Sequence, residues 1–223
     1  MDNLATLFPI SKGITAIVGS GGKTTLAHTL ASQLDGTVIF TTTTRIFPSN
    51  TMPVYVGNDE NQVVELLKLH KKISIGTKVD GGKLAEPTIP FHRLTALADY
   101  VIVEADGSKN LPLKAHRDFE PVIPPGTNRR ILVAGASGFG GEIGQVCHCP
   151  QQFASLANCQ ETHRVTPEIL ATVLKKEALG DLVMVNQCET KEQVIFAKKL
   201  VQLLDIPLIY GSLQHHHWNP AEF

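Results

Sequence analysis

Apolar residues recur along the chain in short runs whose length is typical of buried β-strands. Several runs are almost continuously apolar, which fits strands covered on both faces rather than strands with one face in water. The predicted strands are residues 14–18, 37–42, 53–56, 72–76, 100–105, 130–135, 181–186 and 206–211.

Between these runs lie segments with the amphipathic spacing of helices. The predicted helices are residues 24–34, 61–70, 167–178 and 191–204. Thr166 and Thr190 stand where helix N-caps are expected. Strands that alternate with helices predict an α/β fold, with a mostly parallel sheet and helices on both faces. No linker or repeat divides the chain, so residues 1–223 are predicted to form a single domain, with long loops at 121–126 and 135–144.

The composition is that of an ordinary packed protein, with 43% hydrophobic and 18% charged residues and a formal net charge of -1. This charge offers no basic field for nucleic acid or an anionic membrane, so neither is an expected partner. No apolar run approaches the roughly 20 residues of a membrane span, and the N-terminus lacks a secretory pattern. We therefore expect a cytoplasmic protein. Its four cysteines are too few and too clustered for a disulfide framework.

The first predicted strand leads directly into a glycine-rich turn and a helix. Glycines let successive backbone N–H groups converge on phosphate oxygens, and the helix N-terminus adds a positive dipole. A lysine there can reach outer phosphates, and the next threonine can ligate Mg²⁺. The common spacing would need glycine where Ile17 stands, and the shorter form found here resembles the loop of Mur-type ligases. The predicted nucleotide-binding residues, termed the glycine loop below, are Gly19, Ser20, Gly21, Gly22, Lys23, Thr24 and Thr25.

Two acids follow another apolar run, in "VIVEADG" at 101–107. Ligands of open α/β sheets bind at the carboxyl ends of strands, where Glu104 and Asp106 are predicted to lie. One acid there can hold Mg²⁺ and another can orient an attacking water or hydroxyl. Thr24 and Asp106 are the predicted metal ligands. The alternative is a solvent-facing acid pair at a strand end.

Two further strand ends carry polar residues. "TTTTRIF" at 41–47 offers hydroxyls and the guanidinium of Arg45 for an anion, although threonines are also ordinary strand residues. "VNQCE" at 185–189 resembles a degenerate base-recognition motif of GTPases, in which Asn186 and Glu189 would bind the base. Alternatively, Glu189 only favours the start of the following helix.

Residues 135–150 contain two weaker patterns. The glycines at 135, 138 and 140 are spaced like a dinucleotide-binding turn, but Pro150 and the absence of a helical stripe argue against one. Cys147, His148 and Cys149, together with Cys159, offer ligands for a soft metal, but the C-x-C spacing lacks a matching second pair and His163 is only loosely placed. Neither pattern by itself predicts a site.

Taken together, "VGSGGKTT", "TTTTRIFP", "VEADGSKNLPLKAHRDFEPVIP" and "VMVNQCE" resemble the selenium-dependent hydroxylase accessory protein family known as YqeC. The resemblance spans residue 13 to about residue 190, and the stretch from Glu104 to His116 is its most specific part. It implies a P-loop protein involved in maturation of selenium-dependent molybdenum hydroxylases. It also adds Lys109, Lys114 and His116 to the expected site.

These observations favour a P-loop NTPase-like protein that binds ATP or GTP with Mg²⁺ and hydrolyses or transfers phosphate. Glu104, Asp106 and Lys109 are the candidate catalytic residues, and Lys114 and His116 are expected to hold an anionic small-molecule acceptor. One alternative is a nucleotide-gated chaperone that delivers selenium or molybdenum cofactor to an apo-hydroxylase with little turnover. Another is a Mur-like ligase or small-molecule kinase.

Overall fold

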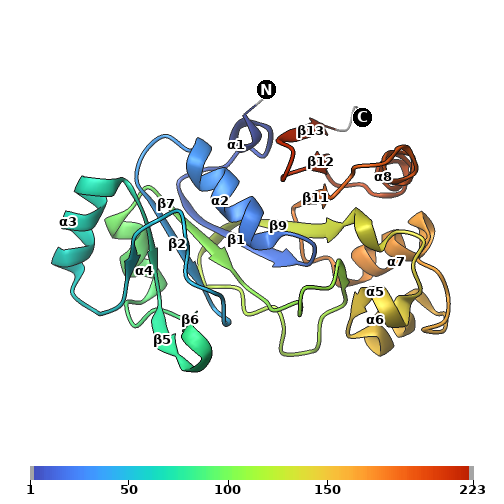
Figure 1. Ribbon diagram of the computed structural model, residues 1–223, viewed down its shortest axis with the longest axis horizontal. Coiled ribbons are helices and arrows are strands. Elements are labelled where there is room, and N and C mark those ends of the chain that lie inside the picture. Colours follow the sequence, from blue (N-terminus) through green and yellow to red (C-terminus); the bar gives the residue numbers. More distant parts are fainter. Residues whose placement is uncertain (1–2, 221–223) are drawn as a thin grey trace.

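A nine-stranded, mostly parallel sheet forms the centre of the computed structural model, which describes residues 3–220 (Figure 1). Residues 1–2 and 221–223, the ends of the predicted domain, lie outside the described residues. Every neighbouring pair of strands is parallel except β12 with β13. The spatial order is β13 (His217–Pro220), β12 (Leu208–Ser212), β11 (Leu182–Asn186), β9 (Thr127–Gly135), β1 (Gly13–Gly19), β7 (Tyr100–Glu104), β2 (Val38–Thr42), β4 (Lys72–Ile75) and β3 (Val54–Tyr55).

All eight predicted strands are present, and the predicted α/β class with a mostly parallel sheet is confirmed. The continuous apolar runs arise because both faces of the sheet are covered. In β2 and β11, for example, every residue is buried. A short antiparallel hairpin, β5 (Thr77–Val79) with β6 (Lys83–Ala85), stands apart from the main sheet.

Helices cover the two faces unequally. One face packs against α1 (Leu4–Leu7) and α2 (Lys23–Gln33). The opposite face packs against two groups of helices (Figure 1). These are α3 (Glu60–His70) and α4 (Phe91–Leu97) at one end, and α5 (Ile143–Val146), α6 (Pro150–Ala157), α7 (Pro167–Glu177) and α8 (Lys191–Leu203) at the other. In residues 3–220 no helix has both the length and the apolar character to cross a bilayer.

The four predicted helices are confirmed as α2, α3, α7 and α8, and both predicted threonine caps form. Thr166 accepts from the N–H of Ile169, and Thr190 forms a reciprocal capping box with Gln193. The sequence does not predict helix α6, because a proline usually ends a helix. In the structure, Pro150 lies in the first turn of α6, where the backbone N–H that proline lacks would have no partner within the helix. The expected loop at 135–144 also contains a short 3-10 helix and the start of α5.

The chain order places a reversal point at β1. The chain passes from β1 toward β2 on one side, whereas β9 lies on the other side of β1. The carboxyl ends of β1, β7, β9 and β11 therefore meet at one edge of the sheet, where ligands of open α/β folds bind. A two-residue parallel pair, β8 (Leu113–Lys114) with β10 (Cys147–His148), joins the segments that follow β7 and β9.

Candidate functional site

The glycine loop connects the end of β1 at Gly19 to the start of α2 at Lys23. Its backbone has φ of 93° at Gly21 and 125° at Gly22, a region that residues with a Cβ rarely adopt. A side chain on Gly21 would also collide with the backbone of Gly135 at the end of β9. Glycine is therefore required here because the loop is both left-handed and tightly packed.

The side chain of Lys23 is buried and turns back toward the end of β1. Its Nζ donates to the carbonyl oxygen of Gly19 at 2.7 Å and lies 3.0 Å from Oδ1 of Asp106. A second carboxylate oxygen, Oε1 of Glu104, lies 3.7 Å away. The predicted lysine and both predicted acids thus come together at the sheet edge, beside the N-terminus of α2.

Asp106 lies beneath the glycine loop with a fully buried side chain. Its Oδ2 accepts from the N–H of Gly19 at 2.8 Å and lies 2.6 Å from Nε2 of His116. Burial alone would raise the pKa of Asp106, but the hydrogen bond with His116 and the charges of Lys23 and Lys114 outweigh it and lower the pKa to about 2. Asp106 therefore remains an anion that fixes the loop from below.

Glu104, unlike Asp106, contacts the first turn of α2. Its Oε2 accepts from the Thr24 hydroxyl at 2.7 Å. Burial raises the pKa of Glu104, and the nearby Lys23 charge and the Thr24 hydrogen bond only partly offset this effect. Thr24 is exposed, so this pair combines an accessible hydroxyl with a carboxylate whose pKa lies above its ordinary range.

Lys114 and His116 are buried rather than extended toward solvent, which corrects the expected acceptor-binding loop. Nζ of Lys114 donates to the carbonyl of Gly107 at 2.6 Å and lies 2.9 Å from Oε2 of Glu120. Nδ1 of His116 lies 3.1 Å from Oε2 of Glu177, at the end of α7. Both side chains are therefore occupied by partners within the protein.

A pocket of about 320 Å³ opens at the glycine loop. It is lined by Gly21, Gly22, Lys23, Thr24, Thr25, Glu104, Ser108, Asn110, Leu111, Pro112, Ser137 and Gln187. Asp106 is absent from this lining because it lies underneath the loop. None of the last six residues is a predicted site residue, although five of them lie in stretches that carry the family resemblance, and they follow β7, β9 and β11.

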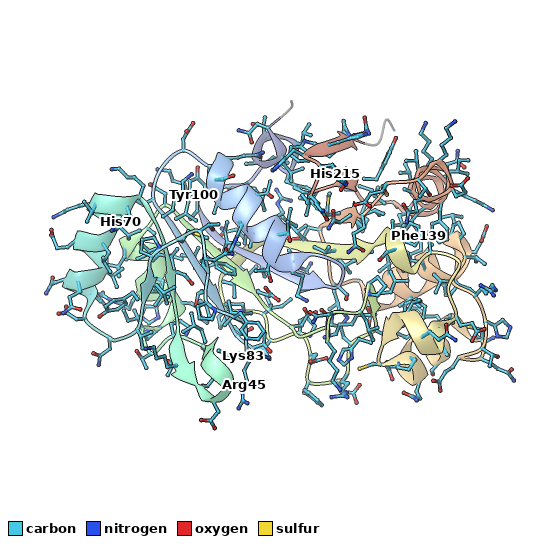
Figure 2. The ribbon with its side chains drawn as sticks, viewed as in Figure 1. Arg45, His70, Lys83, Tyr100, Phe139 and His215 are labelled. Carbon is cyan, nitrogen blue, oxygen red and sulfur yellow. The ribbon has the colours of Figure 1, made fainter. Side chains whose placement is uncertain are left out.

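Three predicted site residues do not line this pocket. Arg45 is exposed near the β5–β6 hairpin, beside Lys83 in Figure 2, and the adjacent Ile46 bridges to that hairpin. Lys109 is exposed at the turn after β7. Glu189 is also exposed and lines a separate hollow of about 660 Å³ with His215. The structure places Arg45 and Glu189 away from the glycine loop, whereas Lys109 lies between Ser108 and Asn110, which both line the pocket.

Asn186 and Ser20 hold the loop in place. Nδ2 of Asn186 donates to the carbonyl of Gly21 at 2.7 Å, and its Oδ1 accepts from the N–H of Leu213 at 2.9 Å. The Ser20 hydroxyl donates to the carbonyl of Leu111. Because both ends of the Asn186 amide are engaged, its role here is to position the loop rather than to present a base-reading edge.

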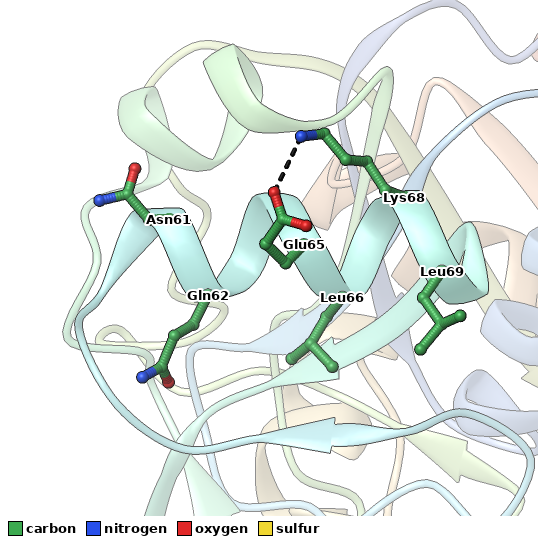
Figure 3. Close-up of a pocket in the computed structure, with 6 residues that line it drawn as sticks. All are labelled: Asn61, Gln62, Glu65, Leu66, Lys68 and Leu69. Carbon is green, nitrogen blue, oxygen red and sulfur yellow. Dashed lines mark hydrogen bonds and ion pairs between the residues drawn. The ribbon is translucent and has the colours of Figure 1, made fainter.

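A larger hollow of about 790 Å³ lies along the outer face of α3 (Figure 3). All six lining residues come from this one helix, and Lys68 pairs with Glu65 at 2.8 Å within it. Within residues 3–220, no charged residue of another element lines this hollow. Lys23 and Glu104, from two different elements, meet at the smaller pocket at the glycine loop. We therefore take that pocket as the candidate site.

Comparison with known proteins agrees with the motifs that build this site. The family model described as "YqeC protein" matches residues 15–151, which include the glycine loop and the segment from Glu104 to His148. The chain belongs to the YqeC family. It is also similar to a protein of Escherichia coli (strain K12) named "Uncharacterized protein YqeC", with 33% identity over 229 aligned positions that cover 91% of this chain and 88% of that protein.

Proposed function

We propose that this member of the YqeC family binds a nucleoside triphosphate, ATP or GTP, with Mg²⁺ on a P-loop NTPase-like fold. The observation that carries the proposal is the buried Lys23 ammonium at the N-terminus of α2, directly after a left-handed glycine turn. Gly21, Gly22, Lys23 and the first turn of α2 line one pocket, and a glycine turn with a lysine at a helix N-terminus is an arrangement that binds phosphate oxygens.

Thr24 and Glu104 are the residues that would hold Mg²⁺ in this proposal. Both line the pocket, and their oxygens lie 2.7 Å apart. Hydroxyl and carboxylate oxygens are the ligands that this hard cation prefers, and it usually keeps several waters. The metal would stabilise the charge that develops on the phosphates. Asp106, which the sequence indicates as a metal ligand, instead positions Lys23 and Gly19 from below the loop.

Phosphate binding would change the surroundings of Lys23. This ammonium is now balanced by Asp106 and, at longer range, by Glu104. A phosphate in the pocket would compete for the same charge and shift Lys23 away from Asp106. Because Asp106 also contacts His116 and Lys114, that shift would reach β8 and the end of α7.

This connected network favours a nucleotide-gated chaperone over a ligase or kinase. A ligase or kinase would need an acceptor pocket beside the phosphates, and Lys114 and His116, the residues expected to hold the acceptor, are buried and paired within the protein. A chaperone needs only a conformational change coupled to nucleotide. We propose, from the family resemblance, that the change serves maturation of selenium-dependent molybdenum hydroxylases, with γ-phosphate hydrolysis resetting the cycle.

Isothermal titration with ATP and with GTP, each with and without Mg²⁺, tests the proposal. At least one nucleotide should bind saturably, and Mg²⁺ should strengthen the binding. Failure of both nucleotides to bind would contradict it. Phosphate release, measured alone and with an apo-hydroxylase, then separates the two roles, because a gated chaperone should turn over slowly alone and faster with its partner.

A further inference from the structure

Three metal-ligating side chains meet beside the small β8–β10 sheet, outside the pocket described above. They are Glu120, which follows β8, and the adjacent residues His148 and Cys149. The ligand atoms of the three all lie within 4.8 Å of one another. Glu120 is far from His148 and Cys149 in the sequence, so the spacing of the cysteines alone does not predict this cluster.

Each side chain is held by local structure. His148 belongs to β10, which pairs with Lys114 of β8. Cys149 has a left-handed backbone with φ of 57° and caps α6, directly before Pro150. The Glu120 carboxylate is positioned by its 2.9 Å ion pair with Lys114. The cluster is therefore built on a paired strand, a helix cap and a buried charge, which limits the reorganisation that a bound ion would require.

The side chains of the cluster are at least partly withdrawn from solvent. His148 is buried beside Lys114 of the paired strand. Cys149 is a free, half-buried thiol. Oε2 of Glu120 is buried, and its ion pair with Lys114 lacks hydrogen-bond geometry.

We propose that Cys149, His148 and Glu120 bind a Zn²⁺-class divalent ion and leave its fourth position open. A thiolate, an imidazole and a carboxylate form a mixed S, N, O set that suits Zn²⁺ and disfavours Mg²⁺. Bonds of about 2.0–2.3 Å to a tetrahedral ion place ligands roughly 3.3–3.8 Å apart, so the cluster needs to contract only slightly. Glu120 has two carboxylate oxygens, so it can bind the ion while Lys114 stays close.

Lys114 connects this metal site to the glycine loop. Its Nζ lies 2.9 Å from Oε2 of Glu120 and 3.6 Å from Oδ2 of Asp106, and Asp106 in turn lies 3.0 Å from Nζ of Lys23. An ion on Glu120 would offset part of the charge of that carboxylate, so the Lys114 ammonium would interact relatively more strongly with Asp106. The metal site is distinct from the Mg²⁺ position proposed at Thr24 and Glu104, yet it is electrostatically coupled to that position.

The test is metal binding by the nucleotide-free protein. The wild-type chain, dialysed against buffered Zn²⁺, should retain one equivalent. Co²⁺ used as a spectroscopic probe should give the charge-transfer absorption of a cobalt–thiolate bond. Cys149→Ser should abolish that absorption, and Glu120→Gln and His148→Gln should each weaken the binding of Zn²⁺ by about tenfold or more.

Cys159→Ser is the matched control, because Cys159 is also a half-buried free thiol but lies outside the cluster. It should bind both ions like the wild type. Thermal melts will identify variants that fail to fold. If Cys149→Ser fails to fold, Glu120→Gln and His148→Gln still test the site. Absence of bound Zn²⁺ in the wild type, or equal losses in the two serine variants, would overturn the site. Since no nucleotide is present, the result is independent of the function proposed above.

Discussion

Nε2 of His116 lies 2.6 Å from Oδ2 of Asp106, the same oxygen that accepts from the N–H of Gly19 in the glycine loop. The other ring nitrogen lies 3.1 Å from Glu177. The imidazole thus stands between two carboxylates and ties the loop to α7. Burial alone would lower the pKa of His116, but the hydrogen bonds with Asp106 and Glu177 outweigh it and raise the pKa.

This arrangement predicts a pH dependence of stability. A histidine whose pKa is raised on folding contributes its full stabilisation below its unfolded pKa of roughly 6.5, and loses it as the pH rises through the folded value. Urea unfolding between about pH 5 and about pH 9 should therefore show stability falling with pH in this window. His116→Gln should be less stable by about 1–3 kcal/mol at the acidic end and should flatten the profile.

The matched control for that series is His92→Gln, which changes an exposed histidine in α4. It should keep the wild-type slope. Asp106, Glu177, Lys23 and Lys114 are the charged groups around His116 or its partner Asp106, and all four remain in both variants. An unchanged slope in His116→Gln would show that another group is responsible.

Lys23→Ala should weaken nucleotide binding by roughly tenfold to a hundredfold, because it removes a charge-assisted contact worth about 1.5–3 kcal/mol. It should also reduce stability, since Asp106 and Glu104 lose a buried counter-charge. Calorimetry with ATP and GTP at a temperature where circular dichroism shows the variant folded checks the first effect. Lys78→Ala, an exposed lysine in β5, is the control and should bind like the wild type.

The sheet and the glycine loop could be predicted because their signals are local. An apolar run of five residues at 14–18, a glycine turn and an amphipathic helix are contiguous, and each obeys a short-range rule. The two acids could be placed near the loop because Glu104 ends an adjacent parallel strand, and carboxyl ends of such strands meet at one edge.

The surroundings of Asp106 could not be predicted, because its partners come together only through the tertiary fold. Glu177 lies at the end of a helix 61 residues from His116, and no periodicity links them. Lys114 is expected from the sequence to hold an acceptor, and no local pattern shows that the pairing of β8 with β10 buries it. The same pairing places His148 near Glu120, so residue spacing could not predict the proposed metal cluster either.

Thr24→Ala should weaken nucleotide binding in the presence of Mg²⁺ more than it weakens nucleotide binding without metal. The reason is that Thr24 offers an exposed hydroxyl beside Glu104 and contributes no charge to the phosphates. Titrations of Mg²⁺ at fixed nucleotide measure the effect. Thr29→Ala is the control further along α2, where the hydroxyl donates to the carbonyl of Thr25. Equal Mg²⁺ curves for all three proteins would remove Thr24 from the metal site.

Gly22→Ala should reduce nucleotide affinity by about tenfold or more. Its backbone φ is 125°, and an added Cβ would collide with the Asn186 amide that holds the Gly21 carbonyl. Gly126→Ala is the control that introduces backbone strain without a collision, because Gly126 also has positive φ, at 79°, but faces open space. It should cost about 1–3 kcal/mol of stability and leave nucleotide affinity unchanged.

The collision itself can be tested by a double-mutant cycle with Asn186→Ala. That change alone should weaken binding, since it frees the Gly21 carbonyl. Added to Gly22→Ala, it removes the atoms that the new methyl group meets, so the combined loss of affinity should be smaller than the sum of the two single losses. Calorimetric affinities of the four proteins measure this difference. Strictly additive losses would mean that backbone strain at Gly22, rather than contact with Asn186, controls the loop.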